Sequence, residues 1–309
     1  MDRKRAKAVI VGHAVGDALG VPVEFCRREK LDKQPVTDML GYGTYSVPAG
    51  AWSDDTSMAL CTLDALATFG VDYDRILVNF GKWYYRDEFT PTGKMFDVGT
   101  TCSIAIDNYF IREMPYTKCG LADERSNGNG SLMRIHPVVL FLADRDMPLS
   151  EKLQTVHTAS ALTHAHDCTK IGCGIYAFIL WELLKNPSLQ SVQKGLQKAE
   201  AFYSGQEACK RYGRLFDRAF GKAPRSEIAS GGYVVDTLEA AVWCLLTTES
   251  FSAAVLQAVN LGGDTDTVAA VCGGLAGALY GYDAIPQKWR DTLLKREYLE
   301  DLCDRAFRE

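Results

Sequence analysis

The stretch 264–280 constrains the fold of this chain more than any other part of its sequence. Its second part, 268–280, is apolar and built mainly of small residues, with three glycines. Such a run predicts a buried helix that neighbouring helices can approach closely. Its first part consists of residues that cap helix starts: Asp264, Thr265, Asp266 and Thr267. Capping needs only one of them, so two interpretations stay open, a simple cap or a site for a hard divalent cation.

A second segment repeats this pattern. Ser53, Asp54 and Asp55 precede another apolar run, 57–66, and Ser53 is the expected N-cap. Neighbouring helical residues point about 100° apart, so the two aspartates diverge and are able to serve different ions. If the two helix starts face each other, their four carboxylates converge, and two charges ~4 Å apart repel by about 4 kcal/mol at an effective dielectric of about 20. Such a cluster needs protons or cations, whereas two independent caps do not.

Helical patterns dominate the remaining chain. We predict helices at the following positions, with closing helices after 283: 5–20, 54–69, 72–86, 97–110, 132–142, 169–184, 234–246 and 251–260. No alternation of apolar and polar residues is sustained enough to predict a sheet. The predicted fold class is therefore all-α, in one compact domain over residues 1–309. Glycines 12, 16 and 20 give the first helix a smooth face for close packing.

Composition indicates which classes of partner and which cellular location to expect. A formal net charge of -5 argues against a protein that binds the phosphate backbone, so no nucleic-acid partner is expected. Ten scattered cysteines without a C-x-x-C pair favour buried free thiols in a reducing environment, and a cytoplasmic location is expected. The apolar run near the start is interrupted by His13 and Asp17, so it is expected to be too short for a signal peptide or a membrane span.

Loop segments carry further candidate residues. Glu24 follows Pro22, which cannot continue a helix, so Glu24 is expected on a loop, where most glutamates are simply solvated. The stretch 25–50 is polar and interrupted by Gly and Pro, which predicts a long loop and a candidate flexible lid. Asp97 opens the helix expected over 97–110 and is a candidate cap.

A glycine-rich turn over 126–131 precedes the helix predicted at 132–142. Backbone amides in such a turn, at the positive end of a helix, suit a diphosphate group, although a turn without a ligand is the alternative. The turn lacks the Gly-Lys-Ser/Thr sequence of a loop that binds nucleoside triphosphates, so ATP binding is not expected.

Two histidines, His164 and His166, lie just before the helix predicted at 169–184. They are two residues apart, and no third histidine or cysteine has helical spacing with them, which disfavours zinc. We therefore expect His164 to contact a ligand and His166 to be a bystander, with His136 and His157 structural. Tyr233, in a Gly-Tyr turn, is either a core residue or a stacking or ribose contact.

Taken together, the motifs resemble those of the ADP-ribosylglycohydrolases, in particular the branch named for the dinitrogenase-reductase-activating enzyme. Seven motifs carry the resemblance, in order: 16–25, 52–56, 96–101, 127–134, 163–164, 232–238 and 263–267. They extend over almost the whole chain. Each motif is weak alone, but the ordered set is specific.

The resemblance implies an orthogonal helical bundle that holds two divalent cations, Mg²⁺ or Mn²⁺. The metal ligands it implies are Ser53, Asp54, Asp55, Asp264, Asp266 and Thr267; relatives often carry threonine in place of Ser53. The catalytic residues it implies are Glu24, on a loop over the metals, Asp97, at the scissile ribose, and Asp55. The ADP-ribose contacts it implies are Asn127, Gly128, Asn129, Gly130, Ser131, His164 and Tyr233.

The function that follows is hydrolytic removal of ADP-ribose from a modified protein side chain. Two close cations can orient the ribose hydroxyls and lower the pKa of a bound water, while Glu24 and Asp97 handle protons. Asp97 favours arginine as the acceptor. Serine-linked ADP-ribose, a small ADP-ribosyl ester, and a non-catalytic ADP-ribose-binding protein are the alternatives. The expected partners are an ADP-ribosylated protein and the product ADP-ribose, with no membrane.

Overall fold

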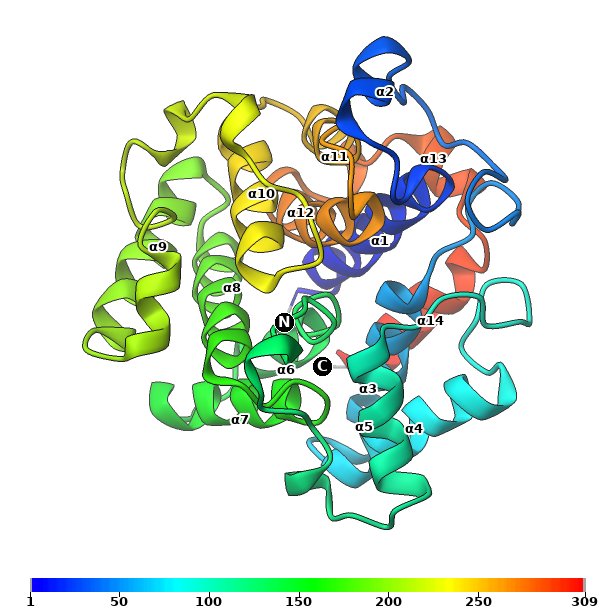
Figure 1. Ribbon diagram of the computed structural model, residues 1–309, viewed down its shortest axis with the longest axis vertical. Coiled ribbons are helices and arrows are strands. Elements are labelled where there is room, and N and C mark those ends of the chain that lie inside the picture. The colour runs from blue at the N-terminus through cyan, green and yellow to red at the C-terminus, as the bar shows by residue number, and fades with distance from the viewer. Residues whose placement is uncertain (1, 308–309) are drawn as a thin grey trace.

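A computed structural model describes residues 2–307 of the chain (Figure 1). Its α-helices are α1 (Arg3–Gly20), α2 (Arg28–Lys33), α3 (Asp54–Phe69), α4 (Tyr73–Arg86), α5 (Thr100–Phe110), α6 (His136–Leu142), α7 (Leu149–Ala161), α8 (Asp167–Lys185), α9 (Leu189–Tyr203), α10 (Val234–Leu246), α11 (Phe251–Val259), α12 (Thr265–Tyr280), α13 (Gln287–Thr292) and α14 (Arg296–Ala306). Within these described residues the only β-type pairings are two isolated bridges, Leu121 with His164 and Gly128 with Tyr233. The all-α prediction is confirmed; a single domain over 1–309 stays a prediction.

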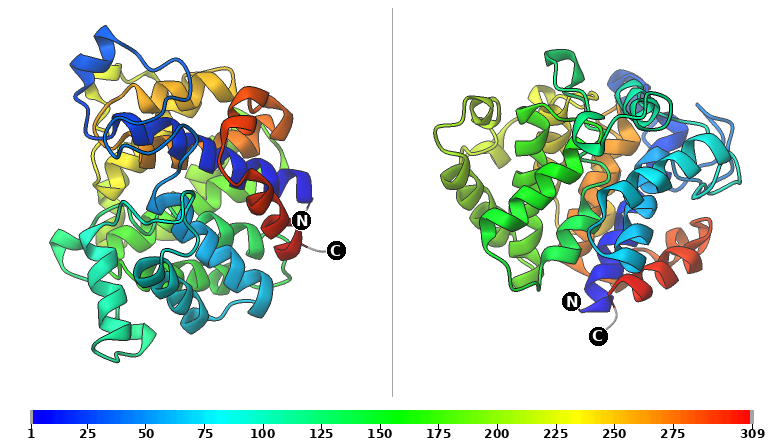
Figure 2. Two further views of the ribbon diagram at one scale, coloured as in Figure 1. Left: turned by 90° about the vertical axis from the view of Figure 1, so that its right-hand side faces the viewer. Right: turned by 90° about the horizontal axis from the view of Figure 1, so that it is seen from below.

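Helices α1 and α12 lie side by side through the middle of the molecule in Figure 1 and Figure 2. Glycines make this contact possible, as the sequence predicted. A methyl group on Gly16 would lie 2.0 Å from the carbonyl oxygen of Ala269, and one on Gly277 would lie 2.0 Å from that of Ala8. Real side chains cannot approach so closely, so the small residues fix the separation of the two helices. The N-terminal end of α12 thereby meets the C-terminal end of α1.

Helices α3, α4 and α5 lie on one side of this central pair in Figure 1, and α7, α8 and α9 lie on the other. The core is continuous: α1 also packs against α3, α6, α11 and α14, and α8 packs against α7, α9, α10 and α12. All ten cysteines are free thiols in the structure, and nine of them are buried.

Three local predictions were wrong. The helix expected from residue 97 begins at Thr100, and its N-cap is Gly99, so Asp97 does not cap it. The helix expected from residue 132 begins at His136, because Pro137 has no N–H and fits only the first turn of a helix. The predicted loop 25–50 contains the short helix α2, which buries Leu31.

The apolar run at the N-terminus is longer than expected. The helix with its 3₁₀ extension, Arg3–Val23, is long and apolar enough to cross a membrane by length and composition alone. However, 89% of its apolar window is buried inside the fold, so its apolarity is accounted for by core packing against α12.

Candidate metal centre and active site

The site is built where the starts of α3 and α12 meet the end of α1. Ser53 is the N-cap of α3, as predicted, and its hydroxyl accepts a hydrogen bond from the Asp55 backbone N–H at 3.3 Å. Asp264 occupies the N-cap position of α12, but its side chain makes no capping hydrogen bond. The carboxylates at the α12 start are therefore in excess of what capping requires.

Two overlapping groups of carboxylates converge there. The ligand atoms of Asp17, Asp55 and Asp266 all lie within 4.8 Å of one another, and so do those of Glu24, Asp264 and Asp266. Asp266 belongs to both groups. The two acidic helix starts do face each other, but three of their four aspartates, Asp55, Asp264 and Asp266, belong to these groups, and Asp54 does not. Its role as a metal ligand stays a prediction.

Burial and missing partners distinguish these carboxylates from ordinary surface acids. Asp17, Asp55 and Asp266 are each at most 1% exposed. One oxygen each of Asp55, Asp266 and Glu24 is buried without a hydrogen-bond partner. A buried charged oxygen without a partner is costly, and a set made only of oxygen ligands suits hard divalent cations. The residues present therefore fit the expected metal ions.

The electrostatics follow from burial and from like charges at close range. Burial raises the pKa of Asp54, Asp55 and Asp266 well above the ordinary value, and neighbouring carboxylates raise it further. Burial also raises the pKa of Glu24 to about 8, with the charge of Asp97 adding to the shift. Without cations, these side chains retain protons at pH values where an exposed carboxylate is ionised.

Asp54 and Asp55 point in different directions, as expected for neighbours on a helix. One oxygen of Asp54 accepts from the backbone N–H of Gly99 at 3.4 Å, and Asp54 lines the cavity described below. Asp55 instead accepts from the hydroxyls of Ser53 at 2.9 Å and Thr267 at 3.3 Å. These two predicted hydroxyl ligands therefore orient the Asp55 carboxylate in this structure.

Asp17 is a site residue that the sequence analysis did not assign. Its carboxylate accepts from the backbone N–H groups of Ser53 at 2.9 Å and Thr56 at 3.0 Å, and from the Thr56 hydroxyl at 2.6 Å. Burial raises its pKa to about 6, although these hydrogen bonds act in the opposite direction. Asp17 thus ties α1 to the start of α3. The available signal was a charged residue between Gly16 and Gly20 on the packing face of an apolar helix.

Glu24 and Asp97 are joined by a second unassigned residue. The Tyr45 side chain lies close enough to both carboxyl groups to lower the pKa of each, and its ring lies 5.1 Å from that of Phe96. Tyr45 comes from the segment 25–50, which is also held to the metal turn: the Phe25 N–H donates to the Gly263 carbonyl at 2.8 Å. This segment therefore closes one wall of the site.

A cavity of about 340 Å³ opens beside the carboxylates. Nine predicted site residues line it: Glu24, Asp54, Asp97, Gly128, Asn129, Gly130, His164, Asp264 and Thr267. Residues from six separate regions of the sequence are thus brought to one cavity. Helix packing, and not any single motif, creates it.

The glycine-rich turn is only partly placed as predicted. The Asn129 N–H donates to the Gly232 carbonyl at 3.0 Å, and its side-chain amide donates to Asp264 at 2.8 Å and to the Thr237 hydroxyl at 2.9 Å. These donors are already used, so Asn129 orients Asp264. Ser131 is fully buried and its hydroxyl accepts from Ser160 at 2.8 Å, so this side chain does not face the cavity.

Asn127 and Tyr233 lie behind the cavity lining. The Asn127 amide donates to the Glu124 carbonyl at 3.1 Å, and the Tyr233 hydroxyl lies 3.5 Å from the guanidinium of Arg211. His166 caps α8 by accepting from the Cys168 N–H at 3.0 Å, so its position as a bystander has a structural reason. Contacts of Asn127 and Tyr233 with ADP-ribose stay a prediction.

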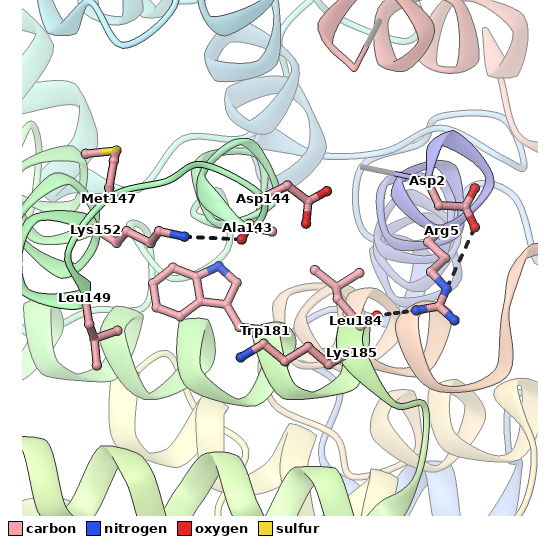
Figure 3. Close-up of a pocket in the computed structure, with 10 residues that line it drawn as sticks. All are labelled: Asp2, Arg5, Ala143, Asp144, Met147, Leu149, Lys152, Trp181, Leu184 and Lys185. Atoms are coloured by element: carbon pink, nitrogen blue, oxygen red, sulfur yellow. Dashed lines mark hydrogen bonds and ion pairs between the residues drawn. The ribbon is translucent and has the colours of Figure 1, made fainter. Parts of the chain in front are cut away.

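A second cavity, of about 410 Å³, has a different character (Figure 3). Trp181 forms an apolar wall, and the charged groups around it have partners. The Arg5 guanidinium donates to the Leu184 carbonyl and the Lys152 ammonium donates to the Ala143 carbonyl at 3.2 Å. Lys185 pairs with Glu182 at 3.0 Å. Among the described residues, none of those lining it is a predicted site residue, so cavity size does not identify the active site.

Known proteins are similar to this chain in both sequence and fold. The chain matches the ADP-ribosylglycohydrolase family over residues 1–309. It is 34% identical over 305 residues to the "ADP-ribosylarginine hydrolase Tri1" of Serratia proteamaculans, and the aligned region covers 98% of this chain and 79% of that protein. It is 30% identical over 298 residues to the "ADP-ribosyl-[dinitrogen reductase] glycohydrolase" of Rhodospirillum rubrum, covering 94% and 90%. A solved structure described as an "ADP-ribosylglycohydrolase-related protein complex" has a TM-score of 0.83 at 32% identity, covering 99% of this chain and 98% of that chain.

Proposed function

This chain belongs to the ADP-ribosylglycohydrolase family, and we propose that it is a metal-dependent hydrolase that removes ADP-ribose from modified arginine side chains of proteins. The resemblance predicted from the ordered motifs is confirmed. Relatives whose names state activity on ADP-ribosylarginine align over 98% of the chain, which supports arginine as the acceptor.

The proposed cofactors are two divalent cations, Mg²⁺ or Mn²⁺. The carboxylates that would hold them are Asp17, Asp55 and Asp266 in one group and Glu24, Asp264 and Asp266 in the other. Ser53, Asp54 and Thr267 remain proposed ligands on the basis of the family resemblance. When bound, such ions orient ribose hydroxyls, lower the pKa of a coordinated water and neutralise developing negative charge. The observation that carries the proposal is this shared carboxylate cluster with unpartnered buried oxygens, beside a cavity that Asp97 lines.

Glu24 and Asp97 would handle the protons of the reaction. In the metal-free protein burial raises the pKa of both carboxyl groups. Asp97, which lies outside both convergent carboxylate groups, can hold a proton at a pH where an exposed carboxyl is ionised, and Glu24 can do so when no cation is bound to it. One of them protonates the departing guanidine or the ring oxygen, and the other positions the attacking water. Tyr45 lies beside both groups and lowers the pKa of each, against the effect of burial. Developing positive charge at the anomeric carbon is stabilised by the nearby carboxylates.

The test is release of free ADP-ribose from arginine-linked and serine-linked peptides, each measured with Mg²⁺, with Mn²⁺ and with EDTA. We expect metal-dependent release from the arginine-linked peptide alone. Release from the serine-linked peptide alone would preserve the metal site but overturn the acceptor. Binding of ADP-ribose without release from either peptide would instead indicate a non-catalytic binding protein.

A further inference from the structure

Arg134 is a buried cation that has no carboxylate partner among the described residues 2–307. Its side chain is fully buried, and its electrostatic neighbours among the described residues are the thiols of Cys61, Cys102 and Cys173. The guanidinium lies 4.7 Å from the ring centroid of Phe80. Burial of a charge in this way is costly, so its hydrogen bonds are informative.

One of those hydrogen bonds leads to the active-site cavity. The Arg134 Nη2 donates to the Thr163 hydroxyl oxygen at 2.7 Å, and that oxygen lies 2.9 Å from Nδ1 of His164. The other terminal nitrogen donates to the Ala159 carbonyl at 3.2 Å. Arg134, Thr163 and His164 therefore form a continuous chain from the protein interior to a residue that lines the cavity.

The hydrogen bonds that join Arg134, Thr163 and His164 favour one arrangement of protons. A guanidinium can only donate, so Thr163 accepts from Arg134 and retains its own hydroxyl proton. The neutral imidazole nitrogen is a stronger acceptor for that proton than the nearby thiol of Cys102. The Cys102 sulfur instead lies 3.9 Å from the Gly130 carbonyl oxygen, to which its S–H can donate. The positive charge of Arg134 also favours a lone pair, and not an N–H, on the side of the ring that faces it. Nδ1 is thus the acceptor, and the ring proton resides on Nε2.

The other side of the ring faces the glycine-rich turn. A methyl group on Gly128 would lie 3.5 Å from Nε2 of His164, and one on Gly130 would lie 2.8 Å from Cε1. Glycine at position 130 therefore leaves room for the ring. Burial and the charge of Arg134 lower the pKa of His164 to about 3, so the ring stays neutral in ordinary working conditions.

Backbone hydrogen bonds position the His164 backbone independently of the Arg134 and Thr163 side chains. The His164 N–H donates to the Ser160 carbonyl at 2.9 Å, and the Ala165 N–H donates to the Leu121 carbonyl at 2.7 Å. The contact of Arg134 with Thr163 is therefore not needed to place the His164 backbone. Its remaining effect is on the ring.

We propose that Arg134, acting through Thr163, is a positioning residue that fixes His164 as the neutral Nε2–H tautomer. In this form His164 presents a hydrogen-bond donor to an oxygen of ADP-ribose, a step that rests on the proposed function. The tautomer itself does not depend on what the protein hydrolyses.

The test is nitrogen NMR of the full chain labelled with ¹⁵N-histidine, with the His164 signals assigned from a His164→Gln variant. We expect the proton on Nε2 in the unchanged protein and in Thr163→Ser, which retains the hydroxyl. In Thr163→Val and Arg134→Met the preference is lost and an Nδ1–H form becomes populated. Calorimetry should show ADP-ribose binding weakened about 2- to 10-fold in Thr163→Val, because one neutral hydrogen bond is lost.

A proton on Nδ1 in the unchanged protein would overturn the proposal, even if Thr163→Val and Arg134→Met failed to fold. An unaltered tautomer in either folded variant would overturn it as well. If the unchanged protein showed the Nε2–H form but did not bind ADP-ribose, the proposed function would fail while the tautomer assignment stood.

Discussion

Glu24 and Glu182 are both buried glutamates, yet their surroundings drive their ionisation in opposite directions. Burial favours the protonated form of each, but hydrogen bonds from Lys198, Lys194 and Lys185 lower the pKa of Glu182 to about 2. The three ammonium groups lie 2.7–3.0 Å from its oxygens. Glu24 lies among carboxylates, and burial with the charge of Asp97 raises its pKa to about 8.

The contrast separates a structural carboxylate from one that needs an external cation. Glu182 receives its positive charges from the fold, since α8 provides Lys185 and α9 provides Lys194 and Lys198. Within the part of the chain that the structure describes, no lysine or arginine forms an ion pair with the carboxylates of the metal centre. Their charge is therefore balanced by protons or by bound cations. Charge balance, more than burial or cavity volume, therefore identifies the functional region, and each prediction below tests this distinction.

The largest effect is expected for Asp55→Asn. Loss of one metal-centre carboxylate should lower kcat/KM for an arginine-linked substrate by about 10³-fold or more, because metal ions supply several kcal/mol of transition-state stabilisation. In EDTA the same variant should be more stable than the unchanged protein, by roughly 1 kcal/mol or more, because folding no longer has to protonate a carboxylate that is ionised in the unfolded chain. ADP-ribose release and urea unfolding in EDTA measure the two effects. A variant that lost stability together with activity would contradict the charge-repulsion account.

Asp97→Asn should have the next largest effect. Activity on an arginine-linked peptide should fall by about 10²-fold, the contribution typical of a positioned acid or base. Asp97 lies outside both convergent carboxylate groups, so stabilisation by Mn²⁺ should be retained in this variant. Parallel measurements of ADP-ribose release and of the thermal midpoint with Mn²⁺ test this separation. Full activity of Asp97→Asn would remove the basis for its proposed role.

Stability should depend on pH in opposite ways in the two regions. Asp17 and Glu24 have folded-state pKa values raised to about 6 and about 8, so without metal the folded protein binds more protons than the unfolded chain between about pH 4 and pH 8. The metal-free protein should therefore lose stability as pH rises across that window. Glu182 contributes stability above its ordinary pKa of 4.5, and this contribution is lost as pH falls toward 2.

Addition of Mn²⁺ should reverse the effect at the metal centre. At a concentration about 100 times its dissociation constant, the ion should add roughly 2.7 kcal/mol of unfolding free energy. Urea unfolding at pH 5, 6.5 and 8, each with EDTA and with Mn²⁺, measures both trends. A metal-free stability that rose steadily from pH 5 to pH 8 would argue against the like-charge cluster.

Glu182→Gln should reduce stability without altering catalysis. Its three lysine partners are 45–67% exposed and can return to water, so the expected loss is about 1–2 kcal/mol and not the larger cost of an abandoned buried charge. Values of kcat/KM should stay within twofold of the unchanged protein. A catalytic defect in this variant would show that the two regions are coupled.

The smallest effect is expected for Lys152→Gln in the cavity of Figure 3. Lys152 makes one hydrogen bond to a backbone carbonyl at the wall of an open cavity, so its loss should change stability by at most about 0.5 kcal/mol and should not change activity. This variant is the matched control for cavity size. A loss of ADP-ribose release here would require a reassessment of which cavity is used.

Local signals predicted much of the fold. The starts of α3 and α12 were placed correctly because a polar capping segment is followed at once by an apolar run. The close packing of α1 against α12 followed from spaced glycines. The starts of α5 and α6 were predicted at the wrong residues. The N-cap of α5 is Gly99, which has no capping side chain, and Pro137 places the start of α6 at His136.

Site residues that depend on distant partners were not found. Asp17 lies within the motif 16–25 and Tyr45 lies outside the seven motifs, but the contacts of both arise only where α1 and the segment 25–50 meet α3 and Asp97. Asn129 was expected to bind the substrate directly, but Asp264, which is 135 positions away in sequence, uses its amide. Spacing along the chain carries no information about such contacts.

The order of the motifs was sufficient to identify the family, helical periodicity identified the all-α class, and the sequence named every carboxylate of the two groups except that of Asp17. These properties depend on residue type and local periodicity, which can be read from residues that are close together in the sequence. Tertiary packing decided that Asp266 belongs to both carboxylate groups, that the hydroxyls of Ser53 and Thr267 converge on Asp55, and that Arg134 reaches His164 through Thr163. Electrostatic repulsion and hydrogen bonding act over a few ångströms of space, so they are set only when helices remote in sequence are packed together.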